Sequence, residues 1–255
     1  MKLRILGCSG GIGAGLRTTS MLIDDDILID AGSGIGDLSL DEMMRIRHIF
    51  LTHSHLDHIA FIPLLLDSVF DRINEPVVVH GLPETLQALK EHIFNWVVWP
   101  DFAELPSTER PVLRYATMTP DQPCSLDGRQ LEMIPVEHAV PAVGYRLESA
   151  NGKVLAFSGD CTSNDTFWYA LNSGPRLDVL IVEAAFPNKY LELSRLARHY
   201  CPSLLAKDMG KLSHDPDVYI THNKPGDEET IIAECRAAMP QRRIQPLRGN
   251  QVFEL

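Results

Sequence analysis

One short segment of this chain constrains its fold more than any other: a histidine- and aspartate-rich run that directly follows an apolar strand predicted over 48–51. His53 and His55 are two residues apart on extended backbone, so their imidazoles point to the same side and can bind one metal ion. Asp57 and His58 lie where the chain turns into an apolar helix, and they can face a second ion. Nitrogen and oxygen donors without a thiolate suit Zn²⁺, Mn²⁺ or Fe. The segment therefore predicts a metal centre at the end of a buried strand.

Three further potential ligands share this position, because each lies just past the C-terminal end of an apolar strand. They are His138, Asp160 and His222. Side chains at strand ends converge on one edge of a sheet, where a rigid scaffold can hold a metal site. Together with the first four, they provide enough donors for two ions that keep positions open for water and substrate.

The charge of the chain limits its partners. Its formal net charge is −11 and its pI is near 5.3, whereas proteins that bind long nucleic acids usually carry a basic surface that displaces counterions. Long nucleic acids are therefore not expected as substrates. A small phosphate ester is compatible with this charge, because two divalent cations would supply local positive charge.

Neither membrane insertion nor export is expected from the sequence. No run of about 18 apolar residues is present, and the apolar stretch at the start meets glycines at once, unlike a secretory signal. The five cysteines are scattered without a C-x-x-C pair, which favours reduced thiols. We therefore expect a cytoplasmic protein that makes no membrane contact.

The hydrophobic pattern predicts one domain over residues 1–255, since no repeat, low-complexity tract or linker interrupts it. The glycine-rich turn after the first strand leads into further strands and not into a helix, so it is not a dinucleotide-binding fingerprint. The predicted strands cover 2–6, 48–51, 76–80, 153–158, 179–183 and 217–221, with two short strands around an Asp-rich hairpin within 18–32 and a strand-rich stretch over 111–147. The predicted helices cover 38–44, 83–94, 191–211 and 228–238, besides the apolar helical segment within 59–70.

Four motifs in this order resemble the metallo-β-lactamase superfamily: HSHLDH, EHAVPAVGYR, FSGDCT and YITHNKPG. The resemblance extends over nearly the whole chain and implies an α/β (α+β) fold, the four-layer αββα sandwich. It implies that one ion is bound by His53, His55 and His138, and the other by Asp57, His58 and His222. Asp160 would bridge the two ions, and a hydroxide between them would be the nucleophile.

Details of two motifs narrow the resemblance to phosphodiesterases. LTHSHLDHI and ITHNKP are similar to the bacterial class II 3',5'-cyclic-nucleotide phosphodiesterases. Glu183 and His199 fall where ribonuclease Z has a supporting Glu and a proton-donating His, although Val182 replaces the His that precedes this Glu. The resemblance implies that His199 protonates the leaving oxygen and that Glu183 orients it. Asp57 is counted with these two as catalytic, besides its role as a ligand.

Some features depart from the two phosphodiesterase families. The chain has no long Gly/Pro-rich arm of the kind ribonuclease Z uses to grip tRNA. The bulky Phe61 stands where the class II pattern usually has a small residue. The aromatic run Phe94, Trp96, Trp99 and Phe102 could stack on a purine base, but we favour core packing or a homodimer contact, because aromatic residues dominate both.

The leading hypothesis is hydrolysis of a small phosphodiester, cAMP or cGMP, to the nucleoside 5'-monophosphate. Zn²⁺ is the expected ion, and the same donors accept Mn²⁺ or Fe. The first alternative is a ribonuclease Z-like endonuclease acting at RNA 3' ends. The second is a non-hydrolytic diiron sensor that binds oxygen, and the same site chemistry also permits lactone or thioester hydrolysis.

Overall fold

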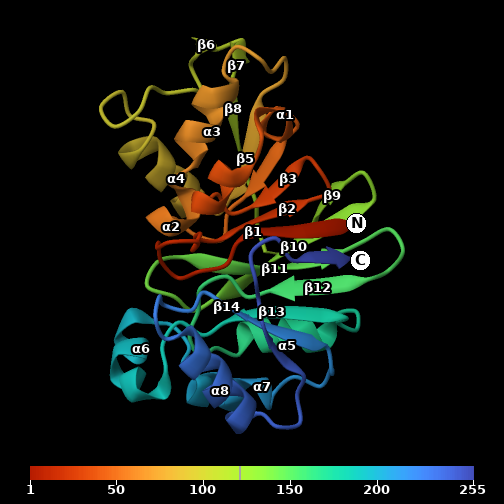
Figure 1. Cartoon of the computed structure of the whole chain (residues 1–255). Helices are drawn as coiled ribbons and strands as arrows, with labels where there is room; N and C mark the ends of the chain where they lie inside the picture. Colours follow the sequence, from red (N-terminus) through yellow and green to blue (C-terminus); the bar gives the residue numbers. More distant parts are fainter. Residues whose placement is uncertain (121) are drawn as a thin grey trace.

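Two seven-stranded sheets stack face to face, and helices cover the outer side of each sheet (Figure 1). This computed structural model describes residues 1–120 and 122–255; Asp121, within the stretch predicted to be strand-rich, lies outside the described residues. The four-layer αββα arrangement predicted from the resemblance is confirmed. No helix in the described residues is both long and apolar enough to span a bilayer.

The first sheet contains most of the N-terminal half of the chain. Its order is β16 (Val252–Glu254), β1 (Lys2–Gly7), β2 (Ser20–Ile23), β3 (Ile27–Ile29), β4 (His48–Phe50), β5 (Val77–Gly81) and β8 (Leu113–Thr117). The strands from β3 to β8 are parallel, and the others pair antiparallel. The helices of this half are η1 (Ser33–Asp37), α1 (Leu40–Met43), α2 (Leu56–Ile59), α3 (Ile62–Val69) and α4 (Pro83–His92). A small hairpin pairs β6 (Pro106–Ser107) with β7 (Arg110–Pro111).

The second sheet comes from the C-terminal half. Its order is β15 (Ile244–Pro246), β14 (Asp217–Thr221), β13 (Val179–Glu183), β12 (Val154–Phe157), β11 (Ala142–Glu148), β10 (Arg129–Val136) and β9 (Cys124–Leu126). The strands from β12 to β15 are parallel, and those from β9 to β12 are antiparallel. The helices of this half are α5 (Thr166–Ser173), η2 (Asn188–Tyr190), α6 (Leu191–Ala197), α7 (Pro202–Met209) and α8 (Glu228–Ala238).

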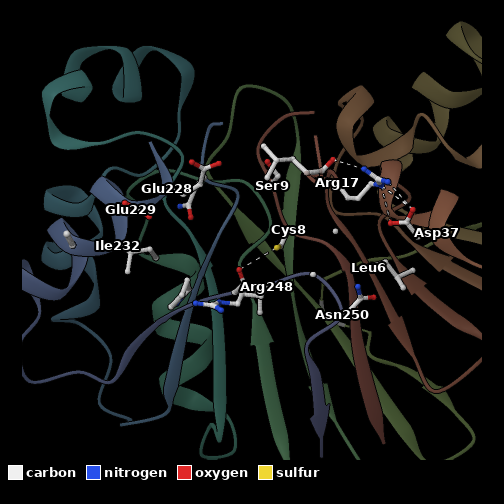
Figure 2. Close-up of a pocket in the computed structure, with 18 of the residues that line it drawn as sticks. Leu6, Cys8, Ser9, Arg17, Asp37, Glu228, Glu229, Ile232, Arg248 and Asn250 are labelled. Carbon is white, nitrogen blue, oxygen red and sulfur yellow. Dashed lines mark hydrogen bonds and ion pairs between the residues drawn. The ribbon is translucent and has the colours of Figure 1, made fainter. Parts of the chain in front are cut away.

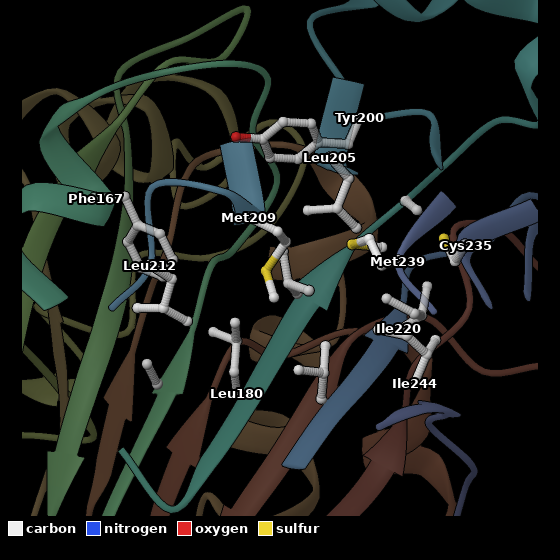
Figure 3. Close-up of a cluster of buried hydrophobic side chains, with 14 of the residues drawn as sticks. Phe167, Leu180, Tyr200, Leu205, Met209, Leu212, Ile220, Cys235, Met239 and Ile244 are labelled. Carbon is white, nitrogen blue, oxygen red and sulfur yellow. The ribbon is translucent and has the colours of Figure 1, made fainter. Parts of the chain in front are cut away.

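Alternation of side chains along the central strands builds three apolar layers. In β12, Leu155 and Phe157 point between the two sheets, whereas Val154 and Ala156 point toward the helices. Figure 3 shows the outer layer of the second sheet, where strand and helix side chains interdigitate. Burial on both faces explains why these strands are almost continuously hydrophobic.

The structure corrects one predicted helix. The stretch predicted as helical over 191–211 is divided, because α6 ends at Ala197 and Arg198 adopts a left-handed conformation with φ 55° and ψ 50°. Pro202 begins α7 and disfavours helical backbone at Cys201, the residue before it. Helix α5 and strands β15 and β16 were not predicted. The break matters because it places His199 in a buried connection and not on a helix surface.

Candidate metal centre

Side chains that follow the ends of strands from both sheets meet at one edge of the sandwich. The structure brings together all seven predicted ligands in two groups. Within each group, the potential ligand atoms all lie within 4.8 Å of one another. The groups are His53, His55 and His138, and Asp57, His58, Asp160 and His222. A third group joins His138 and Asp160 to His199.

Asp160 lies at the centre of this arrangement. Its Oδ2 is 3.2 Å from Nε2 of His222 and 3.3 Å from Nε2 of His58. The same oxygen is 3.8 Å from Nε2 of His53, a member of the other group. Burial opposes ionisation of Asp160, but the neighbouring imidazoles outweigh it and hold the pKa of this carboxyl well below its usual range. Asp160 is therefore a carboxylate within reach of both groups.

Burial keeps most of the histidines in the form that binds metals. It lowers the pKa of His138 to about 4 and that of His222 to about 3. Burial also holds the pKa of His53 well below its usual range. A neutral imidazole has a free lone pair on one ring nitrogen, which is the state in which histidine binds a metal.

Several ring nitrogens of these histidines are free to bind metal ions. Nε2 of His53, Nε2 of His58 and both ring nitrogens of His222 are buried without a hydrogen-bond partner among the described residues. Nε2 of His138 and Nδ1 of His55 face each other at 3.2 Å. Buried polar atoms without partners are costly, and a divalent cation between them would satisfy them. The donor set therefore fits divalent metal ions.

Hydrogen bonds behind the centre orient three of the imidazoles. Nδ1 of His58 donates to Oδ2 of Asp30 at 2.7 Å, and Nδ1 of His138 donates to the carbonyl of Arg198 at 3.0 Å. Nδ1 of His53 lies 2.9 Å from Oγ1 of Thr52, whose own proton goes to Asp30. Each bond fixes the tautomer and leaves Nε2 for the centre, the usual arrangement behind metal-bound histidines.

Asp30 is a site residue that the sequence analysis did not find. It follows β3, is fully buried, and accepts hydrogen bonds from the amide and hydroxyl of Thr52 as well as from His58. Burial raises its pKa, and the bonds from His58 and Thr52 work against that rise. A signal was available, because Asp30 ends an apolar strand just as the predicted ligands do.

Replacing Asp30 with alanine is expected to weaken metal binding about 10- to 100-fold, the usual effect of losing a partner behind a metal ligand. It should also lower the free energy of unfolding by about 1–3 kcal/mol for each buried donor that loses its acceptor, and Asp30 accepts from Thr52 and His58. Chelator competition and urea unfolding measure the two effects. Asp25→Ala, in the exposed hairpin nearby, is the matched control and should change neither. Unchanged metal affinity in Asp30→Ala would contradict the role assigned to Asp30.

His199 and Glu183 form a buried pair beside the centre. Nδ1 of His199 lies 2.7 Å from Oε1 of Glu183. Burial opposes the charge on His199, but Glu183 outweighs it and raises the pKa of this imidazole. The carboxylate also accepts hydrogen bonds from the amides of Cys161, Ala185 and Tyr200. Glu183 is thus held rigidly, and the Nε2 of His199 has no hydrogen-bond partner in the described part of the chain.

The aromatic segment is divided between core and surface. Phe94 and Phe102 are buried in the layer between the first sheet and its helices, and Trp99 packs against that layer. Trp96 is 57% exposed and is followed by the exposed Val97. Packing accounts for three of the four aromatic residues, and the homodimer contact stays a prediction that concerns Trp96.

The chain is similar to several known proteins. Residues 26–222 match the model of the β-lactamase superfamily domain. A probable 3',5'-cyclic-nucleotide phosphodiesterase of Yersinia pestis is 26% identical over 274 residues, covering 88% of this chain and 78% of the relative. A ribonuclease Z of Methanococcus maripaludis is 33% identical over 158 residues, which is 57% of this chain and 48% of that protein.

A solved structure, that of unliganded yeast PDE1, aligns with a TM-score of 0.82 at 20% identity and covers 100% of this chain and 99% of the other. At 20% identity, this structural similarity is evidence for a shared fold only, and the aligned region includes both sheets and their helices. The family model covers most of the chain, including His53, His55, Asp57, His58, His138, Asp160 and His222. The resemblance found in the motifs is confirmed, and the chain belongs to the β-lactamase superfamily.

Proposed function

We propose that this chain is a metal-dependent phosphodiesterase that hydrolyses a cyclic nucleotide, cAMP or cGMP, to the nucleoside 5'-monophosphate. One observation carries the proposal. Asp160 lies close to residues of both groups of potential ligands, and the buried His199–Glu183 pair lies directly beside these groups. A dimetal site alone suits many hydrolytic reactions. A positioned proton donor next to it suits the departure of an alkoxide from a phosphodiester.

The ligand groups divide between two divalent ions, with Zn²⁺ the expected ion. One ion would be held by His53, His55 and His138, the other by Asp57, His58 and His222, and Asp160 would contribute to both. When bound, such ions act as Lewis acids toward the phosphoryl oxygens and lower the pKa of water. The protein keeps these donors buried and oriented, so little reorganisation is needed when substrate binds.

His199 holds the proton for the leaving oxygen. Its Nδ1 is engaged by Glu183, so Nε2 is the nitrogen that can carry a proton toward the substrate. Glu183 stabilises the charged imidazolium and fixes its ring, while three backbone amides keep the carboxylate in place. His199 is therefore the general acid, and Glu183 is a positioning residue.

The substrate class rests on the relatives and on charge. Two relatives that are covered for most of their length are named as 3',5'-cyclic-nucleotide phosphodiesterases, from Yersinia pestis and Aliivibrio fischeri. The net charge of −11 favours a small substrate over a long polyanion. The ribonuclease Z relatives support the second candidate, an RNA 3'-end endonuclease, which clean cleavage of precursor tRNA on a gel would promote over the first.

Steady-state hydrolysis of cAMP, cGMP and bis-p-nitrophenyl phosphate, with Zn²⁺, Mn²⁺ or Fe²⁺ added, tests the proposal. We expect turnover of the chromogenic ester and of at least one cyclic nucleotide, abolished by chelator and restored by metal. Turnover of the chromogenic ester alone would support phosphodiesterase activity but contradict the proposal that a cyclic nucleotide is the substrate. No turnover with any metal, together with an oxygen-dependent absorption band in iron-loaded protein, would favour the sensor instead.

A further inference from the structure

A cavity lies beside the glycine-rich loop that follows β1. Its volume is about 590 Å³, within the usual range of small-molecule sites. Figure 2 shows walls from three parts of the chain: the loop with Cys8 and Ser9, helix α8 with Ile232, and the β15–β16 connection with Arg248. None of the described residues that line it belongs to the three groups of potential metal ligands.

The apolar part of the cavity is built from buried side chains. Leu6, Ile232 and Leu247 come from three separate elements, and each is less than a tenth exposed. On α8, Glu229, Ile232, Ala233 and Arg236 recur at helical spacing, so one face of the helix lines the cavity. A floor fixed by the sheets and a helix is formed before any ligand arrives.

Ser9, Arg236 and Arg248 carry polar atoms at this cavity that lack protein partners. The hydroxyl of Ser9, a residue only 7% exposed, has no hydrogen-bond partner in the residues described. Arg236 donates through Nε to the carbonyl of Ile244, which leaves its terminal nitrogens free. Arg248 makes no side-chain hydrogen bond or ion pair within the described chain. A buried hydroxyl without a partner is unusual in folded proteins, and a ligand would satisfy it.

The charged side chains at the cavity balance in number, because three arginines stand against Asp37, Glu228 and Glu229. Arg17 is paired with Asp37, at 3.0 Å from Nε to Oδ2. Glu228 accepts a hydrogen bond from the amide of Gly226. Arg236 and Arg248 form no ion pair within the described residues, so their terminal guanidinium nitrogens remain available to an oxyanion.

We propose that this cavity binds a small amphiphilic oxyanion, a carboxylate or phosphate monoester with an apolar body. The oxyanion accepts hydrogen bonds from the guanidinium groups of Arg236 and Arg248, and the apolar body lies on Leu6, Ile232 and Leu247. Guanidinium groups bind oxyanions through charge-assisted hydrogen bonds. The site is separate from the metal centre, so it stands whether or not the proposed phosphodiesterase activity is found.

The cavity shares a wall with the metal centre. The carbonyl of Cys8, which lines the cavity, accepts a hydrogen bond from the amide of His222 at 2.9 Å. The amide of Gly10 donates to the carbonyl of Asn223 at 2.9 Å, and Nζ of Lys224 donates to the carbonyl of Gly10 at 2.7 Å. The loop is thus tied at several points to the segment that carries His222.

Fluorescence titration of the metal-loaded full chain with 8-anilinonaphthalene-1-sulfonate, an amphiphilic anion, tests the proposal. We expect saturable binding that octanoate or octyl phosphate displaces and that octyltrimethylammonium does not. Comparing the two displacing anions identifies the preferred head group. The double variant Arg236→Gln/Arg248→Gln should bind the probe about tenfold or more weakly, through loss of charge-assisted hydrogen bonds. The double variant Arg72→Gln/Arg195→Gln, which removes the same charge elsewhere, should bind it normally.

A cavity-filling variant, Ala233→Trp, locates the binding site. Ala233 is on the exposed face of α8, so tryptophan extends into the cavity without entering the core. We expect loss of probe binding with an unchanged melting temperature. Wild-type binding in both this variant and the arginine-to-glutamine variant of the cavity would overturn the site. Equal displacement by the cation, or loss of binding in Ala233→Trp alone, would overturn its selectivity for anions.

Discussion

The Asp160→Ala variant is expected to lose at least about 100-fold in metal affinity, since even a partner one step behind a metal ligand is worth 10–100-fold. Its carboxylate lies within 3.8 Å of imidazoles from both ligand groups, so its removal affects both. Hydrolysis of bis-p-nitrophenyl phosphate should fall to the background rate. Metal analysis after dialysis, paired with the rate, checks both expectations.

Two companion variants sharpen this result. Asp160→Asn keeps the shape of the side chain and one carbonyl oxygen, so a large loss there assigns the effect to the negative charge. Asp165→Ala removes an exposed carboxylate five residues later, which pairs with Lys211, and it should retain full metal content. Retention of two metal equivalents in Asp160→Ala would show that Asp160 is not a shared ligand.

The His199→Ala variant is expected to keep its metal ions while kcat for a phosphodiester falls by about 10²–10⁴, the usual contribution of a positioned general acid. The exposed His92 provides a matched histidine-to-alanine control, which should have wild-type activity. His199 also lies in the third group with His138 and Asp160. Loss of one metal equivalent in His199→Ala would therefore indicate that His199 is a metal ligand, and it would contradict the general-acid role.

The pH dependence separates the role of Glu183 from that of its partner. A general acid must be protonated, so activity is lost as the pH rises through the pKa of His199. Glu183 raises that pKa against the opposing effect of burial. In Glu183→Gln this stabilisation disappears, and the alkaline limb of the pH–rate profile should move to lower pH. An unmoved limb with merely reduced stability would mean that Glu183 is structural only.

The fold and the grouping of the candidate ligands could be predicted from sequence because their signals are local. His53, His55, Asp57 and His58 are close in the chain, and the more distant candidate ligands each follow a recognisable apolar strand. The four-layer arrangement could be predicted only from the family resemblance, because the hydrophobic pattern alone does not show which strands pair. Strands β15 and β16, of three residues each, are too short to show a period.

Other features depend on neighbours that the sequence does not reveal. Asp30 acts through His58, and the two meet only because β3 and β4 pair in parallel. The pattern over 191–211 is helical on both sides of Arg198, so the break became visible only in three dimensions, although Pro202 was a signal for it. The cavity beside the glycine-rich loop is built from residues more than 200 positions apart, such as Leu6 and Leu247, and no local sequence pattern indicates it.

The loop between the cavity and the metal centre has a thermodynamic consequence. Gly10 packs so tightly on His222 that a Cβ there would collide with the histidine's carbonyl, so the loop cannot shift without disturbing that residue. Two binding events that favour the same position of one shared segment are energetically coupled, and coupling of this kind is reciprocal. Whatever factor an anion in the cavity imposes on metal affinity, metal occupancy must impose on the affinity for the anion. Such coupling would make the chain responsive to two cellular supplies at once, that of the metal and that of the anion.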